Sequence, residues 1–194
     1  MSELIPLFGF VFFGLFSPGP NVLLLTTSGA RFGFRPTVPH ILGVALGVGI
    51  IAGVVGWGLG VLLYQFPALS LSLKVTASLW ILWMAVGLWR TDPIKREAIA
   101  ERPFTFAQAV LFQWVNPKIW AVAISATAYV TSLPAGTQAM LLAATFTTIN
   151  LGVCLFWAWA GSLLSLLLAN PAAWRVFMRI MAVALAGFSL AVFL

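Results

Sequence analysis

Residues 4–28 read LIPLFGFVFFGLFSPGPNVLLLTTS, an apolar stretch long enough to cross a lipid bilayer but with two prolines in its second half. A transmembrane helix needs about 20 predominantly apolar residues. The pentapeptide Ser17-Pro18-Gly19-Pro20-Asn21 interrupts this one, because each proline lacks a backbone donor and disfavours helix in the residue before it. Broken backbone is tolerated at membrane depth only where it is buried in protein or lines a polar cavity. We therefore predict a functional break in the first helix, with a simple proline kink as the alternative.

The rest of the chain has the composition of a membrane protein. Of its 194 residues, 62% are hydrophobic and only 7% are charged, and the mean hydropathy is +1.07. A soluble domain carries roughly 25% charged residues, so this chain has too few to cover a water-facing surface. Long apolar runs such as residues 41–63 do not alternate as the strands of a membrane barrel would. The sequence predicts an all-α membrane protein, one polytopic domain over residues 1–194, with about six transmembrane helices.

The apolar runs and the hydrophilic linker divide the chain into two halves. The predicted spans are residues 4–28, 41–63, 71–89, 104–131, 138–168 and 176–194. We expect a loop at residues 29–39 and a cytoplasmic linker at residues 90–103. Repeat 1 would then cover residues 4–89 and repeat 2 residues 104–194.

The basic residues predict the orientation of the chain. Eight of the ten Lys and Arg fall in the odd-numbered connections or at their edges: Arg31, Arg35, Arg90, Lys95, Arg96, Arg102, Arg175 and Arg179. Cytoplasmic loops carry an excess of Lys and Arg. The odd connections are therefore expected in the cytoplasm and both termini in the periplasm. The net charge of +6 then reports orientation, and no nucleic-acid partner is predicted.

A second break, Asn116-Pro117-Lys118, lies about 13 residues into the fourth span, the depth at which Ser17-Pro18 interrupts the first. An ammonium at mid-depth costs about 2.5–3.5 kcal/mol on insertion scales. No span carries an acidic partner, so Lys118 must snorkel, meet water, lose its proton, bond carbonyls or bind an anionic ligand. Breaks at matched depth in oppositely directed spans are typical of inverted-repeat transporters. We therefore predict two inverted three-helix repeats, with helices 1 and 4 broken near the membrane midplane.

The predicted substrate-binding residues are those at the two breaks together with two nearby carboxamides. They are Ser17, Pro18, Gly19, Pro20, Asn21, Gln113, Asn116, Pro117, Lys118 and Asn150. The half-helix that follows Pro20 would present its N-terminal amides to a substrate carboxylate. No catalytic residue, metal site or cofactor is expected.

Two further features of the second span predict how its residues pack and where they lie. Glycines 49, 53, 56 and 60 share one helix face, which favours close helix packing and offers a surface for a dimer. His40 is expected at the interfacial start of the span, with proton relay as the alternative.

The motifs Phe16-Ser17-Pro18-Gly19-Pro20-Asn21, Gly29-Ala30-Arg31-Phe32-Gly33 and Phe112-Gln113-Trp114-Val115-Asn116-Pro117-Lys118 resemble those of the LysE/RhtB family of amino-acid exporters. The resemblance covers essentially the whole chain. It implies efflux of small amino acids across the bacterial inner (plasma) membrane, coupled to proton exchange, and leaves a homodimer open. Since no span holds a carboxylate, we expect neutral substrates such as threonine, homoserine or leucine.

Other functions remain as alternatives. A passive channel or an accessory membrane subunit is the first of them. An intramembrane enzyme is less favoured, because serine hydrolysis needs a base near Ser17 and the only histidine is expected at a helix end.

Overall fold

The computed structural model describes residues 4–17, 19–59, 66–90, 102–167 and 170–191, and every regular element in these ranges is helical. In chain order the elements are α1 (Ile5–Phe16), α2 (Pro20–Phe32), α3 (Phe34–Val54), the π-helical turn η2 (Val55–Leu59), α5 (Pro67–Trp89), α6 (Phe106–Trp114), α7 (Pro117–Ala126), the 3-10 turn η3 (Thr127–Tyr129), α8 (Ala135–Leu167) and α9 (Pro171–Ala191). The helical fold class is confirmed.

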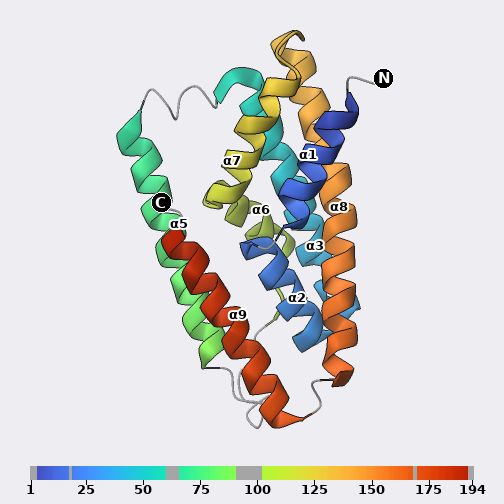
Figure 1. Ribbon diagram of the computed structural model, residues 1–194, viewed down its shortest axis with the longest axis vertical. Helices are drawn as coiled ribbons and strands as arrows, with labels where there is room; N and C mark the ends of the chain where they lie inside the picture. Colours follow the sequence, from blue (N-terminus) through green and yellow to red (C-terminus); the bar gives the residue numbers. More distant parts are fainter. Residues whose placement is uncertain (1–3, 18, 60–65, 91–101, 168–169, 192–194) are drawn as a thin grey trace.

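The chain passes back and forth along the long axis of the molecule. In Figure 1, α1 and α2 descend from the N-terminus, α3 ascends, α5 descends, α6 and α7 ascend, α8 descends and α9 ascends. By length and hydropathy, the described residues contain two helices able to cross a membrane, Phe34–Gly58 and Ala135–Leu164. The bent pair α1–α2 makes a third if it forms one span. Six spans and the inverted repeat stay predictions.

Both predicted helix breaks are present. The first lies between α1 and α2, whose axes differ by 57°, and the second lies between α6 and α7. Pro20 and Pro117 each occupy the first turn of the following half-helix, where the missing N–H of proline costs nothing. Pro18 falls outside the described residues.

The expected loop at residues 29–39 is wrong. Helix α2 continues to Phe32 and α3 begins at Phe34, so Gly33 alone separates them. Its φ of 84° is a conformation that glycine adopts without steric penalty. One residue is therefore enough to turn the chain.

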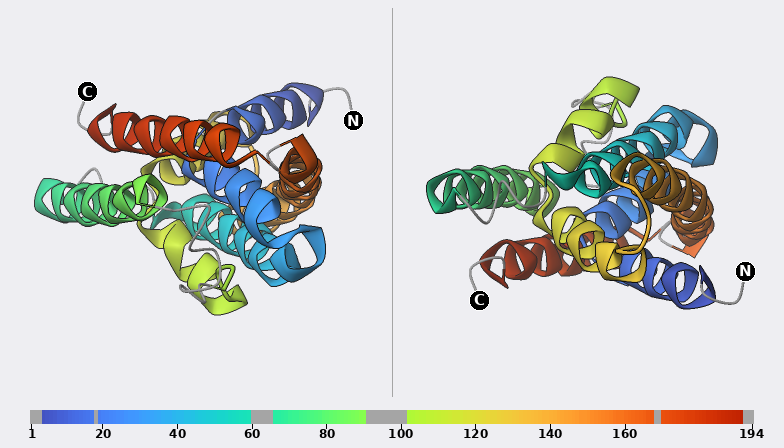
Figure 2. Two further views of the ribbon diagram at one scale, coloured as in Figure 1. Left: turned by 90° about the horizontal axis from the view of Figure 1, so that it is seen from below. Right: turned by 90° about the horizontal axis from the view of Figure 1, so that it is seen from above.

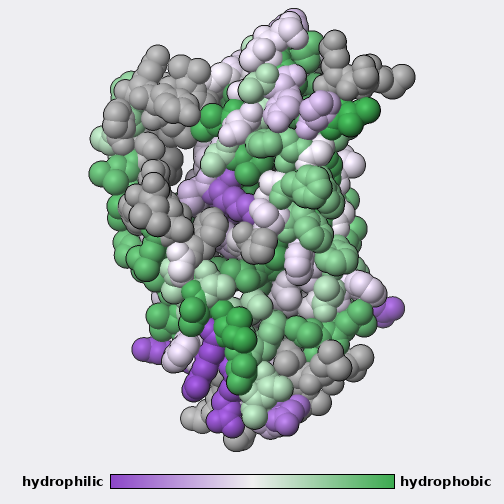
Figure 3. All heavy atoms as spheres, in the orientation of Figure 1, coloured by the Kyte–Doolittle hydropathy of each residue, from purple (hydrophilic) through white to green (hydrophobic). Residues whose placement is uncertain are grey.

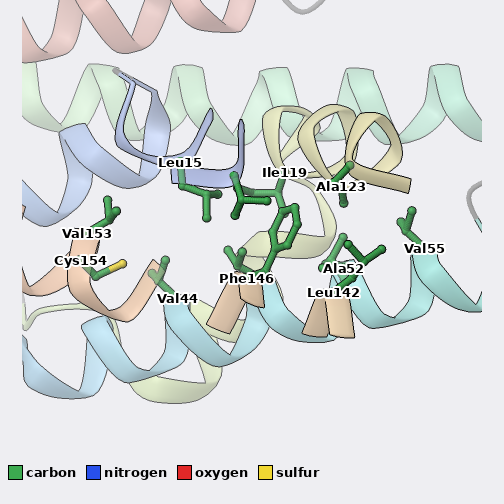
Figure 4. Close-up of a cluster of buried hydrophobic side chains, with 14 of the residues drawn as sticks. Leu15, Val44, Ala52, Val55, Ile119, Ala123, Leu142, Phe146, Val153 and Cys154 are labelled. Atoms are coloured by element: carbon green, nitrogen blue, oxygen red, sulfur yellow. The ribbon is translucent and has the colours of Figure 1, made fainter. Parts of the chain in front are cut away.

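The core lies where α1 and α7 cover the central pair α3 and α8. In Figure 4, Leu15 and Ile119 come from these covering helices and face the side of the pair that carries Val44 and Phe146. All four side chains are buried in one apolar cluster. This cluster fixes the two helix breaks against the same central scaffold.

Glycines bring α3 and α8 into close contact. A Cβ added at Gly49 would lie 1.8 Å from Thr147 Oγ1, and one at Gly56 would lie 2.9 Å from Ala139 Cα. Gly53 also faces α8, with Ala143 Cβ 3.2 Å from its added Cβ. Close packing is confirmed for these three glycines, while Gly60 falls outside the described residues. Since the face is used within the chain, it is not available as a dimer surface.

Helices α5 and α9 form a second pair beside the core (Figure 2). Ser78 Oγ donates to the Ser189 carbonyl at 2.9 Å, and Ser189 Oγ donates to the Ser78 carbonyl at 3.0 Å. The space-filling view shows apolar residues over most of the visible face, most of the hydrophilic residues at its lower end and one hydrophilic spot above its middle (Figure 3). That end carries the C-terminal ends of α2 and α5 and the starts of α3 and α9 (Figure 1).

Candidate functional site

The two helix breaks lie against each other although they are about a hundred residues apart in the chain. Lys118 Nζ donates a hydrogen bond to the carbonyl oxygen of Ser17. Gly19 leaves room for this lysine, since an added Cβ would lie 2.8 Å from Lys118 Cδ and 3.0 Å from Nζ. The first break thus supplies a carbonyl acceptor and the space beside Gly19. The second break supplies the lysine that donates to that carbonyl and occupies that space.

Carboxamides join the same two segments. Asn21 Nδ2 donates to Gln113 Oε1 at 2.8 Å, and Gln113 Nε2 donates back to Asn21 Oδ1 at 3.2 Å. Gln113 Oε1 also accepts from Asn116 Nδ2 at 3.4 Å. Gln113 and Asn116 are completely buried, and a buried polar group is stable only when it is hydrogen-bonded. Gln113 therefore holds both breaks in register.

A small polar cavity, which we call the amide pocket, lies between the breaks. It is lined by Leu15, Gly19, Asn21, Val22, Asn116, Lys118, Ile119 and Asn150. Asn116 Oδ1 and Asn150 Nδ2 are buried without a hydrogen-bond partner. Each unmet group costs about 1–3 kcal/mol, a cost that a ligand with one donor and one acceptor would remove. The volume of about 10 Å³ is near that of one water molecule, so a larger ligand requires the surrounding helices to separate.

The N-terminal ends of two helices converge on the amide pocket. Helix α2 descends from it and α7 ascends from it (Figure 1). Their N-caps, Gly19 and Asn116, form no side-chain capping hydrogen bond. A helix N-terminus carries partial positive charge and orphan amides that bind anions. Together with Lys118, this arrangement suits a carboxylate.

The structure brings together nine of the ten residues singled out in the sequence. They are Ser17, Gly19, Pro20, Asn21, Gln113, Asn116, Pro117, Lys118 and Asn150. Ser17 takes part through its carbonyl, because its hydroxyl donates to the Gly14 carbonyl at 3.0 Å. Sequence reasoning missed the apolar wall of Leu15, Val22 and Ile119, since apolar residues within apolar spans give no distinguishing signal.

His40 does not lie at the end of its helix, and this part of the prediction is wrong. Because α3 begins at Phe34, His40 lies almost two turns inside the helix and is only 2% exposed. Its ring centre is 5.1 Å from that of Phe104, and neither ring nitrogen has a hydrogen-bond partner. His40 lines a second cavity of about 940 Å³, which we call the arginine cavity after Arg31, Arg90 and Arg102 in its wall.

Comparisons with known proteins agree with an exporter. The profile of the family described as LysE type translocator matches residues 12–194. The cysteine/O-acetylserine efflux proteins of Escherichia coli strain K12 and Shigella sonnei strain Ss046 are each 31% identical over 115 residues, which cover 57% of this chain and 56% of each relative. These alignments thus span about half the length of the curated relatives. No solved structure matches the chain.

Proposed function

The chain belongs to the LysE type translocator family, and from this premise we propose that it exports small neutral amino acids across the inner membrane of a bacterium. The observation that carries the proposal is the amide pocket, where two helix N-termini and Lys118 surround one polar cavity. Two matching relatives are named for the efflux of cysteine and O-acetylserine, which are both small neutral amino acids. Threonine, homoserine and leucine are further candidates.

The carboxylate and the ammonium of the substrate would bind different groups. Lys118, Asn150 Nδ2 and the first amides of α2 and α7 provide donors for the carboxylate. Asn116 Oδ1 and the Ser17 carbonyl provide acceptors for the ammonium. The described residues that line the amide pocket include no acid, so they offer no carboxylate to the second cation of a dibasic amino acid.

Transport would proceed by alternating access of two inverted repeats, residues 4–89 and residues 104–194. Two features support this arrangement. Each half contributes one broken helix to the amide pocket, and α3 pairs with α8 as α5 pairs with α9. In each pair the two helices hold equivalent positions in the two halves, as expected for helices close to a two-fold axis between the halves. The linker at residues 90–103 would lie in the cytoplasm and both termini in the periplasm.

Proton exchange would drive the export. The candidate proton carriers are Lys118, His40 and the substrate itself. Lys118 lines the amide pocket and His40 lines the arginine cavity, so both stand where a substrate passes.

Transport by the purified protein in proteoliposomes tests the proposal. Labelled cysteine, O-acetylserine, threonine and leucine are offered under an imposed pH gradient, with lysine as the dibasic comparison and empty liposomes as the control. We expect accumulation of neutral amino acids above equilibrium, chemically unchanged, and none of lysine. Uphill accumulation excludes a passive channel, and an unchanged substrate excludes an enzyme. Failure to move any amino acid would refute the proposal.

A further inference from the structure

The arginine cavity is large, basic and distinct from the amide pocket. Its volume of about 940 Å³ exceeds that of a small amino acid several times over. Three guanidinium groups line it, from Arg31, Arg90 and Arg102, and no acidic residue stands among its described lining residues. Basic side chains that line a concave surface raise the local concentration of anions.

The inner wall of this cavity holds polar atoms that have no partner. Thr27 is 3% exposed and His40 is 2% exposed, and Thr27 Oγ1 and both ring nitrogens of His40 make no hydrogen bond. The nearby hydroxyls are already satisfied, since Ser28 Oγ and Thr37 Oγ1 are 3.0 Å apart and Thr37 donates to the Gly33 carbonyl at 2.8 Å. Buried polar atoms without partners are rare, and here they border a space that a ligand can fill.

A single helix face connects the arginine cavity to the amide pocket. Asn21, Leu24, Ser28 and Arg31 follow one another on α2 at spacings of three, four and three, which places them on one face. Asn21 lines the amide pocket and Arg31 lines the cavity. At 1.5 Å per residue these two positions are about 15 Å apart, which exceeds the length of a small amino acid.

Apolar side chains separate the two cavities. Leu24 and Phe112 are buried in the same hydrophobic cluster. The ring centres of Phe112 and Phe104 are 6.2 Å apart, and those of Phe104 and His40 are 5.1 Å apart. Leu24 lies between Asn21 and Ser28 along this face of α2, so a substrate that moved along the face would pass the cluster.

We infer that the arginine cavity is a second substrate site, which binds the carboxylate of an amino acid before the amide pocket receives it. Arg31 attracts the carboxylate, Thr27 and His40 complete its hydrogen bonds, and Phe32 and Trp83 form apolar walls for the side chain. This inference rests on the proposed function, because it assigns a loading step to the same transport path.

Protection of an introduced cysteine tests the site without requiring transport. Val86→Cys places a thiol on the cavity wall, in a protein that also carries Cys154→Ala and Lys118→Met. The lysine change disables the amide pocket, so any remaining protection reports the cavity alone. The rate of labelling by N-ethylmaleimide is measured alone and with threonine, serine or threonine methyl ester. Serine is the oxygen analogue of cysteine and does not react with the label as a thiol would. We expect the free amino acids at ten times their half-saturating concentration to slow labelling roughly tenfold, and the ester, which lacks a carboxylate, to leave it unchanged.

A matched arginine pair and a distant thiol serve as controls. Arg31→Gln should remove the protection, whereas Arg35→Gln, an exposed residue outside the cavity, should preserve it. Labelling of Asn170→Cys, exposed at the start of α9, should not respond to amino acids. In transport by the wild-type background, Arg31→Gln should raise the KM about tenfold and leave kcat within about twofold, the size expected for one charge-assisted hydrogen bond made in binding.

The outcomes separate this inference from the proposed function. The second site alone would be overturned by three results together. The wild type transports, amino acids do not protect Val86→Cys, and Arg31→Gln leaves the KM unchanged. Slow labelling in phosphatidylglycerol nanodiscs without any amino acid, and fast labelling in phosphatidylcholine nanodiscs, would show that an anionic lipid headgroup occupies the cavity, which also overturns it. Absence of transport in the wild type would instead refute the proposed function.

Discussion

Lys118 shows how one charged residue can be accommodated among apolar helices. Its ammonium donates to a carbonyl that the broken helix leaves exposed, and its methylene stem passes over Gly19. The lysine and the break therefore compensate each other: the cation needs acceptors, and the interrupted backbone provides them. The same cation is placed where two helix N-termini already favour an anion.

Removing this cation is expected to abolish export. In Lys118→Met the carboxylate of the substrate loses a charged donor, and efflux of threonine should fall at least about 100-fold, the effect of roughly 3 kcal/mol. Insertion should persist, because the change removes a buried charge. Efflux from cells and the amount of protein in the membrane are measured together. Arg175→Met, which removes an exposed charge on α9, is the control, and unchanged efflux in Lys118→Met would remove Lys118 from the mechanism.

Gly19 offers a gentler change at the same place. A methyl group in Gly19→Ala would overlap Lys118 Cδ and Nζ, and the flexible lysine can move away, so the protein should still fold. The moved ammonium no longer meets the substrate carboxylate, and we expect the KM to rise about tenfold. Gly9→Ala in α1 is the matched control, since an added Cβ there has nothing within 4 Å. Equal KM values for the two variants would show that the position of Lys118 does not matter for binding.

At the scale of elements, the fold depends on how closely α8 approaches its neighbours. Gly29 and Gly161 form a crossing between α2 and α8, where an added Cβ would lie 2.1 Å from a backbone carbonyl oxygen of the other helix. Small residues permit such contacts, and in a membrane they replace the hydrophobic driving force between helices. The orientation of α2, and with it the position of Asn21, follows from this crossing.

Filling the crossing should destabilise the protein. Gly161→Ala forces backbone apart from backbone, and we expect a loss of about 1–3 kcal/mol in the free energy of unfolding. Gly152→Ala on the same helix meets nothing within 4 Å and should be neutral or stabilising by up to about 1 kcal/mol through helix propensity. Thermal unfolding in detergent, followed by size-exclusion chromatography, measures both. A Gly161→Ala protein as stable as Gly152→Ala would contradict the close contact.

The sequence predicted the helix breaks because proline and glycine act locally. Pro20 and Pro117 disfavour helix in the residue before them whatever surrounds them. It also predicted which polar residues meet, since Lys118, Asn116 and Asn21 have few other places to go in an apolar chain. Local chemistry and the cost of buried polarity were sufficient for this part of the site.

The same reasoning failed where tertiary contacts decide the local structure. The loop was expected to begin at Gly29, yet Gly29 stays helical and forms the crossing with α8. Pro36 is tolerated in the first turn of α3, so it does not prevent helix. The burial of His40 follows from that earlier helix start. The arginine cavity was not predicted, because its wall combines α2, α3, α5 and the start of α6, which the sequence does not place together.

At the scale of the molecule, the described arginines gather at one end, while Lys118 lies at the amide pocket. The turn between α2 and α3, the end of α5 and the start of α9 all lie at the lower end in Figure 1, where Figure 3 shows hydrophilic residues. The positive-inside rule assigns that end to the cytoplasm. We expect alkaline phosphatase fused after residue 194 to be active and green fluorescent protein fused there to be dark. Fusions after residue 90 provide the reverse control, and a fluorescent fusion after residue 194 would invert the proposed orientation.

The two ends of the molecule differ in a way that alternating access requires. The arginine cavity opens at the lower end, whereas above the amide pocket α1 packs on α7, with Val122 Cβ 3.8 Å from a Cβ added at Gly14. That distance suits a disulfide. In a Cys154→Ala protein, oxidised Gly14→Cys/Val122→Cys should therefore lose transport and recover it on reduction, while each single variant transports throughout.

The locked protein also distinguishes gating from damage. The locked protein can also carry Val86→Cys, whose thiol stays free to react while the disulfide holds the other two. Because the crosslink leaves the lower end untouched, an amino acid should still protect Val86→Cys from N-ethylmaleimide in the oxidised protein. Protection without transport means that the substrate loads from the basic end and is stopped at the contact between α1 and α7. Full transport by the oxidised protein would mean that α1 and α7 do not separate during transport. The substrate would then leave by a path that does not pass between these two half-helices.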